Sequence, residues 1–493
     1  MSSSHGGSGA PPPEPERPWF DDDLPNDRQR ARYRRQIEQI RDGLVEALNS
    51  PDRPGWGAPR SDDRRIALDT YPPGVEDSAD ALFVYRTDTL LVAPADLDDV
   101  RADLGRHEVA NEEDGRATDD LGLRVLLLEP DTRSVSDRVG PERVPSPVER
   151  ALAALDAEWD VRRSGSAEGA EGGEGSQPAL RSVSYDRVLH VATASACPAT
   201  DPEPVRDLRP LPPVAADPML GNGVKVVVVD TALPVQSNHR ELVTDKSWLK
   251  GVTGDPEVGM TRAEYRGHGM FVAGVLRTMA PKATVHVEPL VFSCGGVLES
   301  DFAFRLNEVL KEHDPDIVNL SAGTFAGPGG TVPGPQVAAH GHVLVTYDSL
   351  KVMMDGLDCL LVCAAGNNGD TEPFVPASTN WPVAVGALDA YGRRARYSNH
   401  GSYVDVYARG SDLVNAYPQG PTVIAGHSLD FPDGMARWSG TSFAAPMVAG
   451  LVAARMSWSG ENAEDAWASL KGIAIVNNVG GRPILGPGDA DRP

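Results

Sequence analysis

The segment Val224–Val229 (VKVVVV) is a nearly continuous apolar run, and it constrains the fold more than any other feature. Strands of a parallel sheet are buried on both faces, so they read as runs of Val, Ile and Leu rather than as alternating patterns. Helical stretches such as Ser300–His313 alternate with some of these runs, which predicts an α/β fold with a doubly wound, mostly parallel sheet. The further runs are Thr284–Leu290, Ile317–Leu320, Val343–Thr346, Leu360–Ala365 and Val383–Ala387.

A small α+β domain is expected before this sheet, over residues 81–195. Its order of strand, helix, strand, helix, strand favours a ferredoxin-like sandwich. Ser146, followed by Pro147 and by Glu149, is typical of a capped helix start. The expected elements are Ala81–Ala93, Ala95–Leu104, Leu123–Leu128, residues 146 to about 159, and Arg181–Thr193. An acidic, Gly-rich insert, Ser164–Gln177, is expected to be flexible.

The rest of the chain divides by composition. Residues 1–25 are rich in Ser, Gly, Pro and Asp and are expected to be disordered. Residues 26–80 are expected to hold one helix, over Asp27–Asn49, and then a Pro- and Gly-rich linker. Residues 196–220 form a second, Pro-rich linker, and the parallel-sheet domain follows over residues 221–485.

The charge and the cysteines narrow the class of protein. The formal net charge of −25 argues against a nucleic-acid-binding surface or an anionic membrane surface. The sequence shows neither a secretory signal nor an apolar run of about 18 residues, so a cytoplasmic location is expected. The four cysteines show no zinc-site spacing and are expected to be buried free thiols, and no metal ligand is identified.

Three short segments carry candidate chemistry. Asp230 ends the first apolar run, where α/β sheets place functional groups. His268 lies between two glycines at the start of an apolar helix. Ser442 begins a helix rich in small residues, in Gly-Thr-Ser-Phe-Ala-Ala-Pro. Taken singly, these residues could be a turn-capping Asp, a helix-capping His and the Ser cap of a core helix.

Together the three segments indicate nucleophilic catalysis. A serine hydroxyl is a weak nucleophile, so it needs a base within reach, and the base needs a third group that fixes its tautomer. Asp, His and Ser in this chain order are one of the known triad orders. The positive end of a helix dipole at Ser442 would also favour an oxyanion beside it.

At this point a resemblance is plain. Residues from about Gly221 to about Pro483 resemble a subtilisin-like (subtilase) catalytic domain, a little over half of the chain. The resemblance implies a serine endopeptidase with Ser442 as nucleophile, His268 as general base and Asp230 as the residue that orients the base. It implies an oxyanion donor in Asn367, from Ala364-Ala365-Gly366-Asn367.

The resemblance also implies how substrate binds. Ser321, Ala322 and Gly323 are similar to the family segment that pairs with the substrate backbone, and Gly295 and Gly296 are expected to border the other side of the cleft. Protein or peptide substrates follow from this assignment, and no cofactor is required. Calcium is bound by many members of the family, but no calcium site is identifiable in this sequence.

The sequence also departs from the family. Ala232 stands where the family usually has Gly, and Met270 and Phe271 stand where it has Thr and His, which questions local geometry more than the triad. His239 matches a non-catalytic family His, so His268 is favoured as the base. The remaining histidines considered, namely His190, His286, His340 and His342, have no comparable setting.

Two questions stay open at this level. A non-catalytic binding or scaffold protein that keeps the fold is the second hypothesis for the whole chain. An α/β-hydrolase esterase is disfavoured because the motif is not Gly-x-Ser-x-Gly, and a sedolisin-type acid peptidase would not use His268. The domain at 81–195 is either a prodomain, which assists folding and inhibits the site, or a permanent recognition or regulatory module.

Overall fold

The structure is a computed structural model that describes residues 27–50, 66–115, 121–129, 144–168, 182–191, 199–205, 211–234, 246–255, 265–325, 345–424, 427–473, 475–476 and 483–485. The expected disordered tail at 1–25, together with Cys197, His239, His340 and His342, lies outside these residues. Among the described residues, no helix is both long and apolar enough to cross a membrane.

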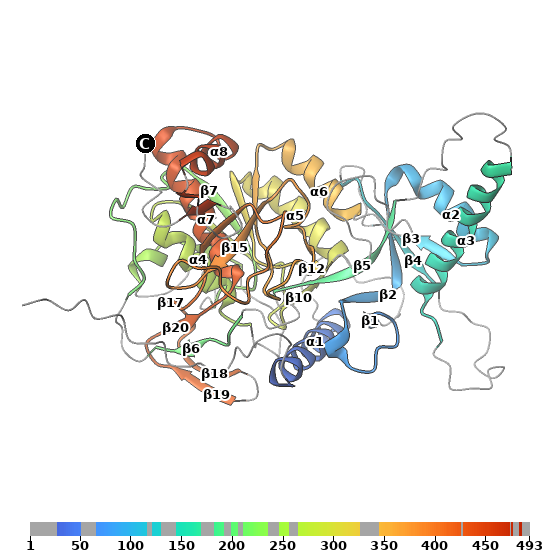
Figure 1. Ribbon diagram of the computed structural model, residues 1–493, viewed down its shortest axis with the longest axis horizontal. Coiled ribbons are helices and arrows are strands. Elements are labelled where there is room, and N and C mark those ends of the chain that lie inside the picture. The colour runs from blue at the N-terminus through green and yellow to red at the C-terminus, as the bar shows by residue number, and fades with distance from the viewer. Residues whose placement is uncertain are drawn as a thin grey trace, which may run out of the picture.

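A nine-stranded sheet forms the core of the larger domain (Figure 1). Its order is β21-β22-β16-β15-β13-β11-β7-β9-β8, and every neighbouring pair is parallel except β21 with β22. The strands are β7 (Lys225–Val229), β8 (Thr253–Gly254), β9 (Thr284–Glu288), β11 (Ile317–Leu320), β13 (Leu360–Ala364), β15 (Val383–Leu388), β16 (Val406–Arg409), β21 (Ile475–Val476) and β22 (Pro483–Leu485). The α/β, mostly parallel architecture predicted from the apolar runs is confirmed.

Helices cover both faces of this sheet. On one face, α4 (His268–Met279) and α7 (Thr441–Ser459) pack into one apolar core with β7 and β15. On the other face, α5 (Glu299–His313) and α6 (Val345–Asp355) belong to a second core. A Cβ on Gly450 would lie 2.6 Å from the Leu276 carbonyl oxygen, so the small residues of α7 are what allow α4 to approach. The short helix α8 (Ala463–Ile473) packs beside α7.

One predicted strand is wrong. Val343–Thr346 was expected to be a strand, but α6 begins at Val345, and residues 343–344 lie outside the described part. The β-branched Val345 and Thr346 favour a strand locally, yet the buried side chains that follow are Tyr347, Leu350 and Met354. These lie three and four residues apart, the period of a helix face, and burying that face overrides local propensity.

The smaller domain has a β-α-β-β-α-β core. Its strands β2 (Phe83–Val92), β3 (Asn111–Glu113), β4 (Arg124–Leu128) and β5 (Val183–His190) lie in the order β5-β2-β4-β3, with all pairs antiparallel. This is the arrangement of a ferredoxin-like sandwich, with α2 (Leu97–Arg106) and α3 (Pro147–Glu168) on one face. The α3 start is a capping box, because the Ser146 N–H donates to Glu149 Oε2 at 2.7 Å and the Glu149 N–H to Ser146 Oγ at 3.4 Å.

Two strands and the end of one helix in the N-terminal half of the chain differ from expectation. The Pro- and Gly-rich segment after α1 (Asp27–Leu48) contains a strand, β1 (Leu68–Tyr71), which pairs with β2. Helix α3 continues to Glu168, into the segment expected to be a flexible insert. The Pro-rich linker contains β6 (Glu203–Pro204), which pairs with β20 (Met435–Trp438) of the larger domain. Each short strand is fixed by a partner that lies outside its own segment, which local composition does not reveal.

The two domains share a sheet as well as a core. Strand β5 reaches out of the small domain and pairs antiparallel with β10 (Gly296–Leu298), as Figure 1 shows. The face of the small sheet that carries Val84 and Leu91 joins the core formed by α5 and α6, and Ile40 and Leu44 of α1 join the same core. The remaining strands are two pairs, β12 (Thr324–Phe325) with β14 (Phe374–Val375) and β18 (Gly420–Ile424) with β19 (His427–Phe431), and β17 (Leu413–Ala416) on β20.

Candidate active site

Asp230 lies directly after β7, at the point where the order of strand connections in the sheet reverses. Strand β9 follows on one side of β7 and β11 on the other, so Asp230 occupies the topological switch point, where α/β sheets place their ligands. Its backbone N–H donates to the Glu288 carbonyl at 3.1 Å, and its Oδ1 accepts from the Thr231 N–H at 2.7 Å. These contacts hold the carboxylate at the end of the strand.

His268 is the first residue of α4 and lies against Asp230. Its Nδ1 is 2.7 Å from Asp230 Oδ1 and 2.9 Å from Oδ2, and both side chains are fully buried. A carboxylate at Nδ1 favours the tautomer with the proton there and leaves Nε2 as the basic nitrogen. Gly269 permits this contact, because a Cβ on it would lie 2.2 Å from the Thr231 carbonyl oxygen and 3.2 Å from Asp230 Cβ.

Aromatic rings surround the imidazole of His268. The Trp438 ring lies edge-on at 5.4 Å between centroids, and the Phe443 ring lies at 5.3 Å. Phe271, one of the departures from the family pattern, packs on both of those rings, at 5.6 Å and 4.5 Å. Phe271 therefore packs behind the two rings that contact His268, and it cannot take part in proton transfer. Within the described part of the chain, His268 Nε2 is buried and makes no hydrogen bond.

Ser442 is the second residue of α7, and its backbone carbonyl accepts a hydrogen bond from a side chain outside the helix. Pro446 stands four residues later and has no N–H, so the helical hydrogen bond to the Ser442 carbonyl is not available. The Ser321 hydroxyl donates to that carbonyl instead, at 3.0 Å, and itself accepts from Asn319 Nδ2 at 3.1 Å. Because buried carbonyls require a partner, this contact ties the end of β11 to the first turn of α7.

The Ser442 hydroxyl faces the same segment in this structure. It donates to the Ser321 carbonyl, at a long distance of 3.4 Å, and the side chain is fully buried. In this structure, a short hydrogen bond joins Asp230 and His268. Ser442 lies nearby on α7, because the residue that follows it, Phe443, packs against the His268 ring.

Asn367 contacts the residue before Ser442. Its Oδ1 accepts from the Thr441 N–H at 2.8 Å and from the Thr441 hydroxyl at 2.9 Å. These bonds fix the orientation of the Asn367 amide through its oxygen and use none of its N–H donors. Thr441 thus orients the Asn367 side chain, a contact that its place inside the Ser442 motif does not by itself reveal.

Three of the residues predicted to bind substrate, Gly295, Gly296 and Gly323, are paired with the end of β5 of the same chain, whereas Ser321 contacts Ser442. The His190 N–H donates to the Gly323 carbonyl at 2.8 Å, and the Gly323 N–H donates to the His190 carbonyl at 3.1 Å. On the other side, the Val191 N–H donates to the Gly295 carbonyl at 3.0 Å, and Gly296 pairs with His190. The end of β5 is therefore a strand between the two expected walls of the cleft. Burial there lowers the pKa of His190 to about 3, so it is neutral.

Thr200, a few residues after the end of β5, contacts the segment that leads into α7. The Thr200 carbonyl accepts from Trp438 Nε1 at 2.7 Å, and the Thr200 hydroxyl accepts from the Ser439 N–H at 3.2 Å. Trp438 also packs against His268, and Ser439 lies three residues before Ser442. The described residues on both sides of 192–198 thus contact the region of the candidate triad.

A second group of titratable side chains lies outside the candidate triad, and no sequence motif indicates it. His286, Glu288 and His313 come together beside the sheet, with their ligand atoms within 4.8 Å of one another. The one available indication was the spacing of His286 and Glu288, two residues apart on one strand and so on one face. Among the described residues, Cys294, Cys359 and Cys363 are buried and form no disulfide, and burial raises the pKa of Cys359 to about 12.

The family model described as the subtilase family matches residues 221–481, more than half of the chain. The chain belongs to the subtilase family. A Thermophilic serine proteinase from Bacillus sp. (strain AK1) is 44% identical over 256 residues, which cover 49% of this chain and 54% of that protein. The chain therefore spans about half the length of that relative.

Two further curated relatives are more distant. Thermitase from Thermoactinomyces vulgaris is 28% identical over 272 residues, 53% of this chain and 85% of that protein. A protein named intracellular serine protease, from Paenibacillus polymyxa, is 28% identical over 251 residues, 47% of this chain and 66% of that protein. All of these matches cover about half of this chain.

Proposed function

We propose that this subtilase is a serine endopeptidase whose catalytic residues are Asp230, His268 and Ser442. The observation that carries the proposal is the buried Asp230–His268 pair, with Nδ1 2.7 Å from the carboxylate, beside the first turn of the helix that holds Ser442. A His fixed in this tautomer has its basic nitrogen free to accept a proton from a serine.

In the proposed reaction, Ser442 Oγ leaves the Ser321 carbonyl, turns to His268 Nε2 and attacks the scissile carbonyl. His268 accepts the proton and later donates it to the leaving amine, while Asp230 stabilises the imidazolium. Asn367 Nδ2 and the Ser442 N–H donate to the oxyanion of the tetrahedral intermediate. Water then hydrolyses the acyl-enzyme by the same proton transfers, and no cofactor takes part.

A fluorophosphonate probe tests this proposal, because it labels only a serine that a base activates. We expect wild-type protein to be labelled and Ser442→Ala not to be, with Ser459→Ala, a change at the far end of the same helix, as the matched control. Equal labelling of wild type and Ser442→Ala, or none in either, would favour the alternative, a non-catalytic binding or scaffold protein with this fold. A peptide library would then define the substrate class.

The β5 segment supports a further part of the proposal, intramolecular inhibition by the N-terminal domain. Its backbone bonds at His190 and Val191 occupy both walls that a substrate strand would use. A prodomain would be cut on the carboxyl side of β5 in a Ser442-dependent reaction, in or near the linker at 196–220, whereas a permanent module would stay uncut. Mass spectrometry of purified wild type and Ser442→Ala over time separates the two, and full activity of an intact chain would exclude the prodomain.

An intracellular location is also proposed, since one relative carries that description in its name. The acidic net charge of −25 is typical of a chain that avoids nucleic acid and anionic lipid. Fractionation of cells that produce the tagged full chain tests the location, and recovery of the protein in the medium or the membrane fraction would contradict it.

A further inference from the structure

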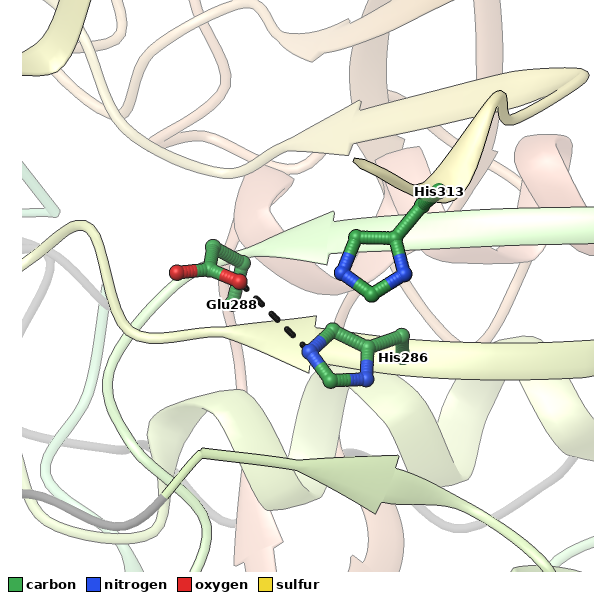
Figure 2. A group of neighbouring side chains, drawn as sticks. All are labelled: His286, Glu288 and His313. Carbon is green, nitrogen blue, oxygen red and sulfur yellow. Dashed lines mark ion pairs between the residues drawn. The ribbon is translucent and has the colours of Figure 1, made fainter. Parts of the chain in front are cut away.

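His286, Glu288 and His313 form a compact group on the side of the sheet away from α4 (Figure 2). His286 and Glu288 are two residues apart on β9 and so share a face, while His313 ends α5, which packs over that face. The two imidazole rings stack with centroids 4.2 Å apart. Glu288 is only 2% exposed, and the two histidines are half-buried.

Two buried atoms of this group lie within ion-pair distance, as the dashed line in Figure 2 shows, but too far apart for a short hydrogen bond. His286 Nε2 and Glu288 Oε2 are 3.5 Å apart, and within the described residues neither has a hydrogen-bond partner. The other ring nitrogen, Nδ1, lies 3.0 Å from Thr253 Oγ1, whose hydroxyl lies 3.5 Å from the Val285 carbonyl. When that hydroxyl donates to the carbonyl, Nδ1–H donates to the hydroxyl, and Nε2 presents a lone pair to a carboxylate. A cation between them would satisfy both atoms.

The second carboxylate oxygen of Glu288 is already held. Arg305 donates to Oε1 through Nη2 at 2.8 Å and through Nε at 3.1 Å, which leaves Oε2 directed to His286. Metal-binding carboxylates and histidines are commonly oriented by such outer hydrogen bonds. Arg305 opposes a nearby cation, but it also pairs with Glu308 at 3.1 Å, which offsets part of its charge.

We propose that His286, Glu288 and His313 bind a divalent transition metal, with Zn²⁺ as the best match. Two imidazoles and one carboxylate are a ligand set that Zn²⁺ uses, with a fourth position open to water. Zn–N and Zn–O bonds of about 2.1 Å in a tetrahedron place ligand atoms roughly 3.4 Å apart, close to the His286–Glu288 separation. His313, half-buried at the end of its helix, needs only a side-chain adjustment to complete the set.

The Glu288 backbone carbonyl accepts from the Asp230 N–H at 3.1 Å, so the group lies next to the proposed triad, but among the described residues its three side chains make no hydrogen bond with Asp230, His268 or Ser442. We therefore expect the metal to act on the packing of helix and strand and not on the reaction. Bound metal would fix the last turn of α5 to β9, and the first turn of α5 is where β5 docks, since Asp186 accepts from the Ser300 N–H at 2.9 Å. The metal would therefore hold in place the helix that receives the N-terminal domain. This role differs from the family resemblance, which pointed only to calcium.

Cobalt titration of the full-length Ser442→Ala protein, stripped with chelator, tests the proposal without autolysis. We expect one Co²⁺ per chain, visible absorption bands typical of tetrahedral nitrogen and oxygen ligation, and displacement by Zn²⁺. Thr253→Val, which removes the partner of His286 Nδ1, should weaken binding about 10- to 100-fold. His313→Gln should abolish the tetrahedral bands, while His427→Gln, at an exposed position on β19, should leave them unchanged.

Thermal unfolding of the same variants gives a second measure of metal binding that does not depend on the cobalt spectrum. Zn²⁺ should raise the Tm of the Ser442→Ala protein and not that of His313→Gln, because a ligand that binds only the folded state stabilises it by mass action. The metal-free Tm of both proteins serves as the check on folding. Absence of cobalt binding at micromolar concentration, or equal spectra and affinity with and without His313, would overturn the proposal and leave a His286–Glu288 ion pair.

Discussion

At the scale of single residues, Pro446 explains the position of Ser321. A proline six residues into α7 removes one helical N–H, and the acceptor left behind is the carbonyl of the proposed nucleophile, Ser442. The Ser321 hydroxyl, at 3.0 Å, replaces that donor. The segment after β11 that we propose to bind substrate and the helix of the proposed nucleophile are thus joined by a contact that compensates for the proline.

A double-mutant cycle on Ser321 and Pro446 measures this contact. Ser321→Ala should cost about 1–3 kcal/mol of unfolding free energy, because it leaves a buried carbonyl without a donor. In a Pro446→Ala background, where the helix N–H is restored, the same change should cost much less. Urea denaturation of all four proteins in the Ser442→Ala background gives the coupling energy, and additive costs would contradict the explanation.

Asn367 allows its two roles to be separated by one substitution. Asn367→Asp keeps the Oδ1 acceptor for Thr441 but replaces the Nδ2 donor, so the start of α7 should remain while the oxyanion loses a hydrogen bond. We expect kcat to fall by at least about 100- to 1000-fold, the range for loss of one such donor in subtilisin, because the carboxylate also repels the oxyanion, with KM changing little. Steady-state kinetics on a peptide substrate check this, and a loss confined to KM would contradict the assigned role.

At the scale of elements, the sequence revealed those parts whose signal is local. The apolar runs that became β7, β11 and β13 were recognisable because strands buried on both faces are continuously apolar. Helix α6 was missed because its β-branched start favours a strand, and β6 because its partner lies far away in sequence. The triad order indicated the site, but the wall of aromatic rings on His268 depends on tertiary packing.

The docking of β5 on α5 should depend on pH. Burial raises the pKa of Asp186 from 3.8 to about 6 and that of Glu299 from 4.5 to about 7. Between the ordinary carboxyl range and pH 7, the docked state therefore binds more protons than the undocked state, so stability is greatest at the acidic end and falls as pH rises. Urea denaturation of the Ser442→Ala protein from pH 5 to 8 should show this fall.

Glu299→Gln is the matched control for that pH dependence. The amide keeps the size of the side chain but has no proton to lose, so the fall in stability between pH 5 and 8 should flatten. Glu308→Gln, an exposed change on the same helix, should leave the dependence as it is. An identical pH profile for Glu299→Gln and the parent protein would show that the titrating group lies elsewhere.

At the scale of the whole molecule, helix α1 packs on β5 and β10, the pair of strands that we propose to close the cleft. Ile40 is fully buried in the core that α1 shares with β5, β10 and α5. A Cβ on Gly296 would lie 2.7 Å from Ile40 Cγ2 and 3.1 Å from Val188 Cγ1, so the helix and both strands meet at a point where only glycine fits. Residues from widely separated parts of the chain thus hold β5 in place.

Loosening α1 should therefore expose the proposed active site. Ile40→Ala removes buried methyl groups at a cost of about 2–5 kcal/mol, and the loss falls on the core that retains β5. We expect faster fluorophosphonate labelling of Ser442 in Ile40→Ala than in wild type, and unchanged labelling in Arg35→Ala, an exposed change on the same helix. In the proposed mechanism, kcat of the fully activated enzyme depends on Asp230, His268 and Ser442 and not on α1, so it should be equal in all three proteins. Equal labelling rates in Ile40→Ala and wild type would mean that β5 leaves the cleft, or admits the probe, without any contribution from α1.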